Sequence, residues 1–212
     1  IGHAAKNLHL YNLSLESYRS ALENAQDKEQ INKSKQAIAW RLFDTGKIYE
    51  AEKIANECVL VKDKYLSYAH DLKATILLNN GYPHRAISHF QKSLILKPKN
   101  QKGYVYYQIS RAFFRNNQID SAIHHQRKAI STFPLKSKND RVKMTATLAK
   151  YLIVGKQIKS GLEWLNKAEN IEGLSNQSKA LIESIKVINE QSEVSLARLE
   201  TLTEVLLSLI HI

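Results

Sequence analysis

The histidines are the first residues of this chain whose type could carry catalysis or hold a metal. His84 and His89 lie five positions apart, and His124 and His125 are adjacent. Neither spacing places two imidazoles on one face of a helix, as positions i and i+4 do in helical metal sites. We therefore expect these histidines on helix surfaces and predict no bound metal.

Cysteine and carboxylate chemistry is equally sparse. Cys58 is the only cysteine, so the chain cannot form an internal disulfide, and no base is identifiable beside it. There is no Gly-rich phosphate loop, no G-x-S-x-G turn and no H-E-x-x-H motif. Carboxylates such as Glu50, Glu52 and Glu57 follow one another along a helix-like segment and indicate a solvated surface. The sequence predicts neither an enzyme nor a cofactor.

The charge balance points to surface interactions instead. The chain has 31 Lys and Arg against 20 Asp and Glu, a net charge of +11. Such a surplus favours acidic partners, including nucleic acid, although a solvated Lys-rich helical surface gives the same number. No run of about 18 apolar residues is present, so we expect no transmembrane helix.

Any surface must be positioned by helices, because only seven Gly and three Pro interrupt the 212 residues. The stretch AISHFQKSLILKP at 86–98 returns 36 residues later as AIHHQRKAISTFP at 122–134. A period of this length is typical of stacked helix pairs.

Small residues mark the same repeat along most of the chain. The sets are Gly2, Ser14, Ala21; Ala39, Ala51, Cys58; Ala74, Ala86, Ser93; Ser110, Ala122, Ala129; and Ala149, Gly161, Ala168. Antiparallel helices approach closely only where the side chains at their crossing are small. Each set therefore predicts a helix, a turn and a second helix. Turn signals lie at 44–49, 79–83, 115–120 and 154–158, and Pro98 and Pro134 end two second helices.

From Ala74 to Pro98, and from Tyr106 to Pro134, this pattern resembles the tetratricopeptide repeat. The resemblance covers residues 1–173 as about five repeats, the first truncated inside its leading helix. It implies an all-α fold, a right-handed α-solenoid of antiparallel helix pairs with about 11–12 helices. Gln126 and Lys73 stand where the family usually has large apolar residues, which predicts looser packing or a shifted register there.

The two ends of the chain depart from the repeat. Residues 174–206 lack the small-residue set, and we interpret them as a capping helix pair. The last six residues, LSLIHI at 207–212, look like the translation of a transposon-end adapter used in sequencing libraries. Together with a first residue other than Met, this indicates an incomplete reading frame with a non-native tail.

In the tetratricopeptide family the first helices line a concave groove, and residues just off their packing face contact partners. Carried over by position, the expected partner-binding residues are Lys33, Gln36, Trp40, Tyr68, Asp71, Thr75, Tyr104, Tyr107, Arg111, Arg115, Lys143 and Lys150. Neighbouring positions hold Phe43, Asp44, Leu78, Asn79, Phe114 and Ala146, of which Phe43, Leu78 and Phe114 are expected to pack between repeats. Aromatic residues and Arg commonly anchor interfaces. Arg111 and Arg115, one turn apart, could grip a carboxylate.

Two functions remain open. The leading hypothesis is a protein-interaction scaffold that binds a peptide or helical segment, acidic or aromatic-containing, within the regulatory or sensor part of a larger bacterial signalling protein. The alternative is a helical repeat protein that binds RNA or another nucleic acid. Its basic patch would comprise Arg127, Lys128, Lys136, Lys138, Arg141 and Lys143, while Asp44 and Asp71 interrupt the first half of the groove.

Overall fold

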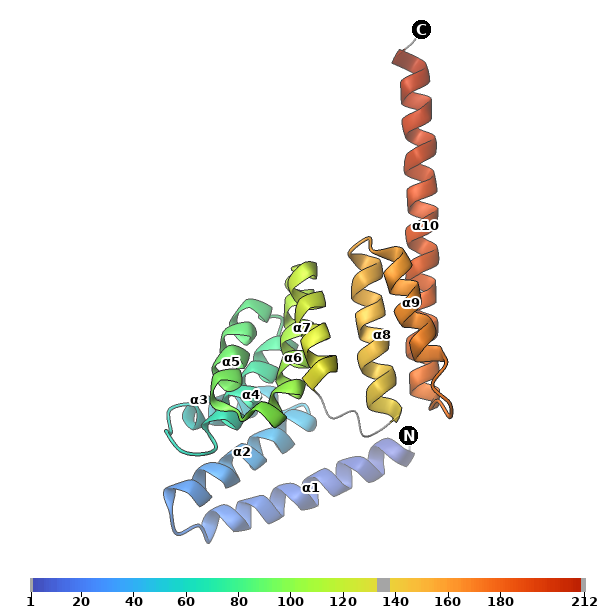
Figure 1. Cartoon of the computed structure of the whole chain (residues 1–212). Helices are drawn as coiled ribbons and strands as arrows, with labels where there is room; N and C mark the ends of the chain where they lie inside the picture. The colour runs from blue at the N-terminus through green and yellow to red at the C-terminus, as the bar shows by residue number, and fades with distance from the viewer. Residues whose placement is uncertain (1, 133–137, 211–212) are drawn as a thin grey trace. The chain divides into compact units, whose positions relative to one another are not determined.

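The structure, a computed structural model, describes residues 2–132 and 138–210, with side chains for residues 10–191 except 133–137, and for 193 and 194. Within these residues the chain forms ten α-helices, one short 3-10 helix and no strand, which confirms the all-α expectation. It divides into two compact units, unit 1 (Ile1–Gln118) and unit 2 (Ile119–Ile212). Figure 1 gives the order of the helices.

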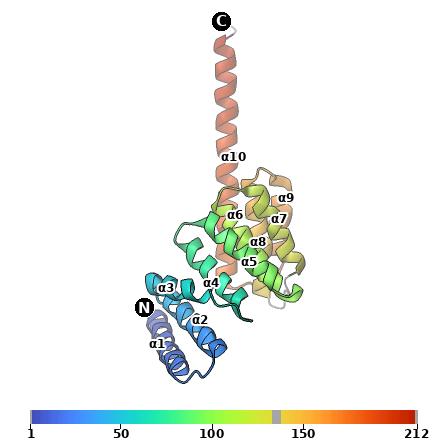
Figure 2. The ribbon, with the colours of Figure 1, turned by 90° about the vertical axis from the view of Figure 1, so that its left-hand side faces the viewer.

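Unit 1 consists of two helix pairs flanked by single helices. Its helices are α1 (Gly2–Glu23), α2 (Lys28–Asp44), α3 (Ile48–Cys58), α4 (Leu66–Asn79), α5 (Pro83–Leu96), the 3-10 helix η1 (Lys99–Gln101) and α6 (Lys102–Arg115). Helix α2 pairs with α3, and α4 pairs with α5. Helix α4 also contacts α2 on one side and α6 on the other (Figure 2). The helices α2, α4 and α6 therefore form one layer of first helices within unit 1.

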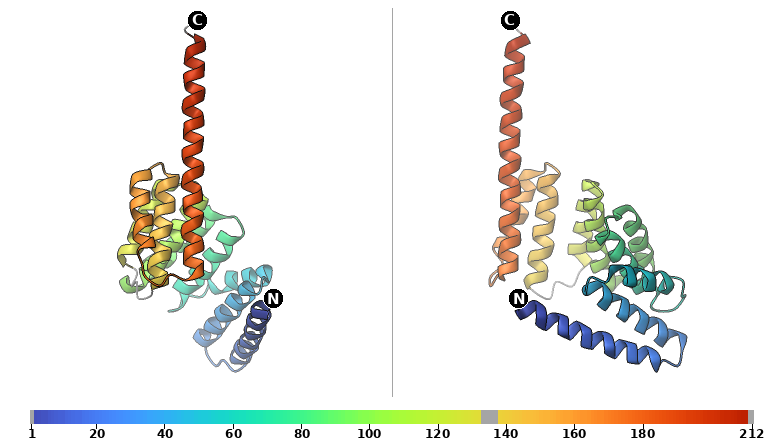
Figure 3. Two further views of the ribbon diagram at one scale, coloured as in Figure 1. Left: turned by 90° about the vertical axis from the view of Figure 1, so that its right-hand side faces the viewer. Right: turned by 180° about the vertical axis from the view of Figure 1, so that it is seen from behind.

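Unit 2 contains one further pair and a long terminal helix. Its helices are α7 (Ile119–Thr132), α8 (Lys138–Val154), α9 (Ile158–Glu169) and α10 (Asn176–Ile210). Helix α8 pairs with α9, and both contact the first part of α10, where Ile182 and Ile185 are buried. The rest of α10 continues well past α8 and α9 (Figure 3).

The same turn ends four of the first helices. In each case a residue two positions past the helix has a positive φ, and the next amide donates to a carbonyl five residues back, as in a Schellman motif. The positive-φ residues are Gly46, Gly81, Asn117 and Lys156, and the amides are those of Lys47, Tyr82, Gln118 and Gln157. Gly46 and Gly81 adopt φ values of 80° and 82°, which a residue without Cβ reaches without strain. All four turns fall where the sequence predicts them.

The small residues of the second to fifth sets, all twelve from Ala39 to Ala168, are buried within their units. Gly161 shows how tight a crossing is, because an added Cβ would lie 2.6 Å from Cγ1 of Ile153 on the paired helix. Small residues recur at these positions because larger side chains would not fit between the packed helices.

The first set and the segment 174–206 do not form the expected helix pairs. Helix α1 runs unbroken through Ser14, and Ala21 on it is exposed; α10 is likewise one helix of 35 residues. Neither 3–13 nor 174–206 contains a Gly or Pro, so nothing local ends the helix. The chain therefore has ten α-helices in its described part rather than 11–12. The expectation for 207–212 concerns side chains outside the described residues.

The two departures from the family pattern are not loosely packed. Gln126 on α7 is fully buried, and its Nε2 donates to the carbonyl oxygen of Met144 on α8 at 2.9 Å. Lys73 is 4% exposed, and its Nζ lies 2.6 Å from Oε1 of Glu52 on α3. A polar side chain can replace an apolar one here because each finds a partner across the helix crossing.

Candidate functional site

The first helices of unit 1 present repeat-equivalent positions as rows, and each row has its own exposure. Lys33, Tyr68 and Tyr104 are exposed. Three residues later in each helix, the next row is buried; it consists of Gln36, Asp71 and Tyr107. We call the exposed row, together with the half-buried Trp40 on α2 and Arg111 on α6, the first-helix face.

The buried row corrects part of the sequence expectation. Tyr107 is only 5% exposed, Asp71 8% and Gln36 6%, and Thr75 in the following row is also buried. Nε2 of Gln36 reaches the carbonyl oxygen of Tyr65, just before α4, and Asp71 pairs with Lys97, just after α5. Leu78 is buried as expected, while Phe43 and Phe114 are half-buried. A partner would therefore meet Lys33, Tyr68 and Tyr104 before these residues.

Tyr68 is held in place by a network between α4 and the segment after α5. Its hydroxyl lies 3.0 Å from Oε1 of Gln101, and Nζ of Lys97 lies 3.7 Å from its ring centre. Nζ of Lys97 also pairs with Oδ2 of Asp71 at 3.0 Å. Burial raises the pKa of Asp71, while Ser93 and Lys97 act in the opposite direction. Asp71 thus links α4 to Lys97 after α5, and the ring of Tyr68 is ordered and exposed to solvent.

Tyr104 and Arg111 are linked along α6 by Gln108. Gln108 donates from Nε2 to the Tyr104 hydroxyl and accepts from Nη1 of Arg111 at 2.8 Å. The Arg111 guanidinium also lies 5.8 Å from the ring centre of Tyr107. An arginine has five N–H donors, so the bond to Gln108 orients Arg111 and leaves other donors for a ligand.

Arg115 contacts the backbone of α4, unlike Arg111. Its Nη1 donates to the carbonyl oxygen of Leu78, near the C-terminal end of α4, at 2.9 Å. Carbonyl groups in the last turn of a helix lack an intrahelical partner, so this bond satisfies one of them. This bond leaves other N–H donors on the exposed Arg115, so a joint grip on a carboxylate with Arg111 stays a prediction.

The remaining predicted residues belong to unit 2. Lys143 is exposed on α8 and Lys150 is half-buried, with Ala146 fully buried between them. Of the basic residues considered for nucleic acid, Arg127, Lys128, Lys138 and Arg141 are exposed. Lys136 lies outside the described residues.

The structure also brings together two histidines that the sequence spacing did not relate. Nδ1 of His70 on α4 lies 3.0 Å from Nδ1 of His89 on α5. Burial lowers the pKa of His70, and lowers that of His89 to about 4 with further effect from His70 and nearby cations. Both imidazoles are neutral at pH 7, one donating and the other accepting. The expectation of an exposed His89 was wrong, because contact across a helix pair has no signal in the spacing along one helix.

Cys58 is a packing residue, as expected from its place in the repeat. It is 1% exposed, and burial raises its thiol pKa to about 12. A thiol held neutral in this way is a poor nucleophile. Among the residues that the structure describes, no group of three or more His, Cys, Asp or Glu could hold a metal.

Comparison with known proteins identifies the architecture. Residues 103–134, which span α6 and α7, match the family model of the tetratricopeptide repeat. The chain contains a tetratricopeptide repeat. No curated protein shows significant sequence similarity to it. Among its described helices, none combines the length and hydropathy needed to cross a membrane.

Several solved structures of tetratricopeptide repeat proteins share this fold. A thermophilic TPR protein of Thermus thermophilus has a TM-score of 0.62 at 17% identity, covering 88% of this chain and 95% of that one. YrrB, a TPR protein with an unusual peptide-binding site, has a TM-score of 0.60 at 15% identity and covers 87% of each chain. A Rap protein complexed with the competence and sporulation factor has a TM-score of 0.63 at 14% identity, covering 86% and 53%. Identities this low establish a shared fold alone.

Proposed function

We propose that unit 1 is a protein-interaction scaffold that binds a peptide or a helical segment of a partner on the first-helix face. The observation that carries this proposal is the state of Tyr68 and Tyr104. Their side chains are 43% and 47% exposed, yet both hydroxyls are held by glutamines. An exposed ring that is already ordered loses little conformational entropy on binding, so its contacts convert efficiently into affinity.

The chemistry of the face favours an acidic partner segment that carries aromatic or apolar side chains. Arg111 can donate to a carboxylate, and Lys33, at the place on α2 equivalent to Tyr68 and Tyr104, adds an exposed positive charge. Asp71 is neutralised by Lys97, so it does not oppose an acidic ligand. The peptide-binding site of YrrB supports the same kind of partner for a scaffold of this fold.

We extend the proposal to a regulatory role within a larger bacterial signalling protein. A rigid stack that captures a segment can report its presence to a kinase, cyclase or DNA-binding domain. This role follows from fold-level analogy. A longer reading frame that encodes such a domain beside the repeats would support the role, and one that encodes only the repeats would count against it.

The decisive experiment compares exposed tyrosines on different helices. Partners are captured from the source organism and identified, and the affinity of the purified partner segment is measured for each variant. The double change Tyr68→Ala with Tyr104→Ala should weaken binding by at least about tenfold, as loss of a pair of interface anchors does.

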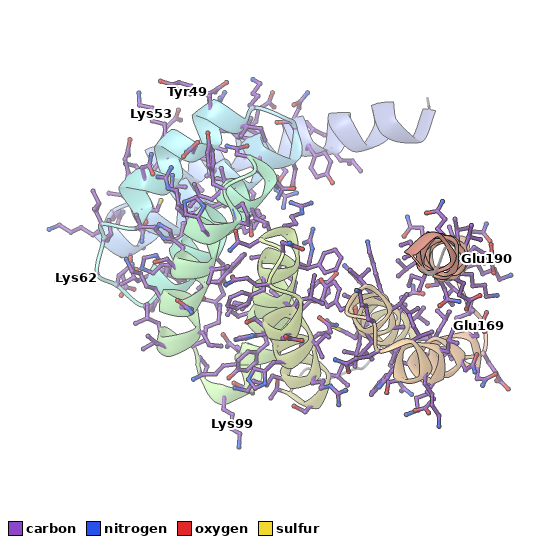
Figure 4. All side chains as sticks on the ribbon, turned by 90° about the horizontal axis from the view of Figure 1, so that it is seen from above. Tyr49, Lys53, Lys62, Lys99, Glu169 and Glu190 are labelled. Atoms are coloured by element: carbon purple, nitrogen blue, oxygen red, sulfur yellow. The ribbon has the colours of Figure 1, made fainter. Side chains whose placement is uncertain are left out.

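Tyr49 provides the matched control. It is 83% exposed on α3 and points into solvent beside Lys53 (Figure 4). Tyr49→Ala should leave binding unchanged, and equal losses in both variants would show that the first-helix face is not the site. If the captured ligand is instead RNA, with a steep loss of affinity as salt rises, the nucleic-acid alternative replaces this proposal.

A further inference from the structure

A pocket of about 130 Å³ lies between the first half of α2 and the end of α3. It is lined by Lys28, Ile31, Asn32, Lys35, Glu57, Cys58 and Val61. Ile31, Cys58 and Val61 give it apolar walls, and Asn32 is anchored by a hydrogen bond from Nδ2 to Oδ2 of Asp63 at 2.7 Å. The neutral Cys58 thiol adds no charge to the interior.

The pocket lies where this repeat has a lysine at a position that holds a ring in the next two. Lys35 occupies the position that corresponds to His70, 35 residues later, and to Tyr106, a further 36 residues on. His70 is buried and Tyr106 is half-buried. Lys35 instead turns to the surface, where its Nζ lies 2.7 Å from Oε2 of Glu57. Lys35 thus lines the pocket with its aliphatic stem and not with a ring.

The size of the space suits one aromatic ring. An apolar cavity of about 150 Å³ in a well-studied lysozyme variant binds benzene. The pocket between α2 and α3 is of similar volume and opens beside an exposed lysine, Lys28. An occupant can therefore bury a ring and keep a polar group at the mouth.

The charges around the mouth select the polar group. The Asp27 carboxylate accepts from the amide of Gln30, and Glu29 pairs with Lys64 at 2.6 Å. Among the charged residues that line the pocket, Lys35 and Glu57 pair with each other, and Lys28 has no ion pair within the described part of the chain.

We propose that this pocket binds a small aromatic carboxylic acid, with the ring against Ile31, Cys58 and Val61 and the carboxylate at Lys28. The proposal is independent of the first-helix face and of any protein partner. A ligand so placed links α2 to α3 and stabilises unit 1 by binding only the folded chain.

The test uses 3-phenylpropionate and its uncharged counterpart 3-phenylpropionamide with the full chain. Binding is followed by amide chemical shifts and by thermal unfolding. Shifts should centre on residues 28–35 and 57–61, and the acid should bind about threefold more tightly than the amide, as an exposed ion pair allows.

Two variants and one control separate the parts of the proposal. Lys28→Gln should remove the preference for the acid, whereas Lys62→Gln, a neighbouring exposed lysine outside the pocket, should retain it. Lys35→Tyr restores the ring of the next repeats and should abolish binding of both compounds while the protein stays folded.

Three results would overturn the proposal: no shifts at the highest soluble concentration, shifts confined to other helices, or equal binding of acid and amide. Unchanged binding by a folded Lys35→Tyr variant would also overturn it.

Discussion

His70 on α4 and His89 on α5 form a hydrogen bond between their imidazole rings. Their Nδ1 atoms lie 3.0 Å apart and their ring centres 5.2 Å apart. The contact needs one ring to donate and the other to accept, so it is lost once both imidazoles are protonated and neither can accept. The charged groups that face it are Lys73, Arg85 and Lys92, all positive. Lys73 is itself paired with Glu52, and the three cations together disfavour an imidazolium at His89.

We predict that unit 1 loses stability as the pH falls from about 6.5 to about 4. Both histidines have a lowered pKa, so the unfolded chain binds protons more readily than the folded one in this window. The contribution of the pair is complete above the unfolded pKa and disappears as the pH passes through the folded one. We expect a loss of about 1–2 kcal/mol, less than the full shift implies because His89 is partly solvated.

Carboxylates also titrate near the lower end of this range, so the measurement compares variants. Denaturant unfolding is followed at several pH values for the wild type, for His89→Phe and for the exposed His84→Phe. His89→Phe should flatten the curve between pH 6.5 and 4, whereas His84→Phe should reproduce the wild type. Parallel curves for all three proteins would show that the His70–His89 pair does not contribute.

The buried ion pair of Lys73 with Glu52 predicts unequal effects for its two members. Glu52→Gln leaves the Lys73 ammonium, 4% exposed, without a counter-charge, and should cost about 2–4 kcal/mol. Lys73→Leu removes the buried charge and supplies the apolar residue usual in the family, so it should lie within about 1 kcal/mol of the wild type.

The exposed pair of Lys35 with Glu57 is the control for this comparison. Its side chains are 35% and 49% exposed, and Glu57→Gln should change stability by less than about 1 kcal/mol. If Glu52→Gln proves as mild as Glu57→Gln, then water reaches Lys73 and the pair is not buried in solution.

Gln126 gives a third prediction, in unit 2. Its side chain fills the α7–α8 contact and donates to the Met144 carbonyl oxygen, which lies within a helix. Gln126→Leu keeps the volume and loses the polar contacts of the amide, so we expect a change within about 1.5 kcal/mol. Gln126→Ala also opens a cavity and should cost about 2–4 kcal/mol. Similar unfolding energies for the two variants would mean that the hydrogen bond, and not packing, dominates.

Much of the fold follows from small residues, because close helix crossings and tight turns are local demands on residue type. Gly46 and Gly81 end their helices in the conformation that glycine favours, and Ala39 and Ala51 lie at the crossing that their size permits. The same reasoning failed where small residues occurred without a turn signal, as at Ser14 in α1. There the continuity of the helix decided the structure.

The sequence predicted which helices form the candidate site, but not which of their side chains are exposed. Repeat position placed Tyr104 and Tyr107 together on α6, yet one is 47% exposed and the other 5%. That difference depends on how the first helices contact one another, which the spacing within one helix does not contain. The His70–His89 contact was missed for the same reason, since it depends on the register between α4 and α5.

Gly161 supplies a final prediction about the helix crossing in unit 2. A Cβ at this position would lie 2.6 Å from Cγ1 of Ile153 and 3.2 Å from the carbonyl oxygen of Ala149, so α8 and α9 must move apart to accept it. Gly161→Ala should therefore cost about 1–3 kcal/mol by overpacking, despite the higher helix propensity of alanine. Gly81→Ala has open space around its Cβ but a φ of 82°, and should cost only about 1 kcal/mol. The two variants are compared by denaturant unfolding, and a Gly161→Ala protein as stable as the wild type would show that this crossing is looser than the 2.6 Å approach indicates.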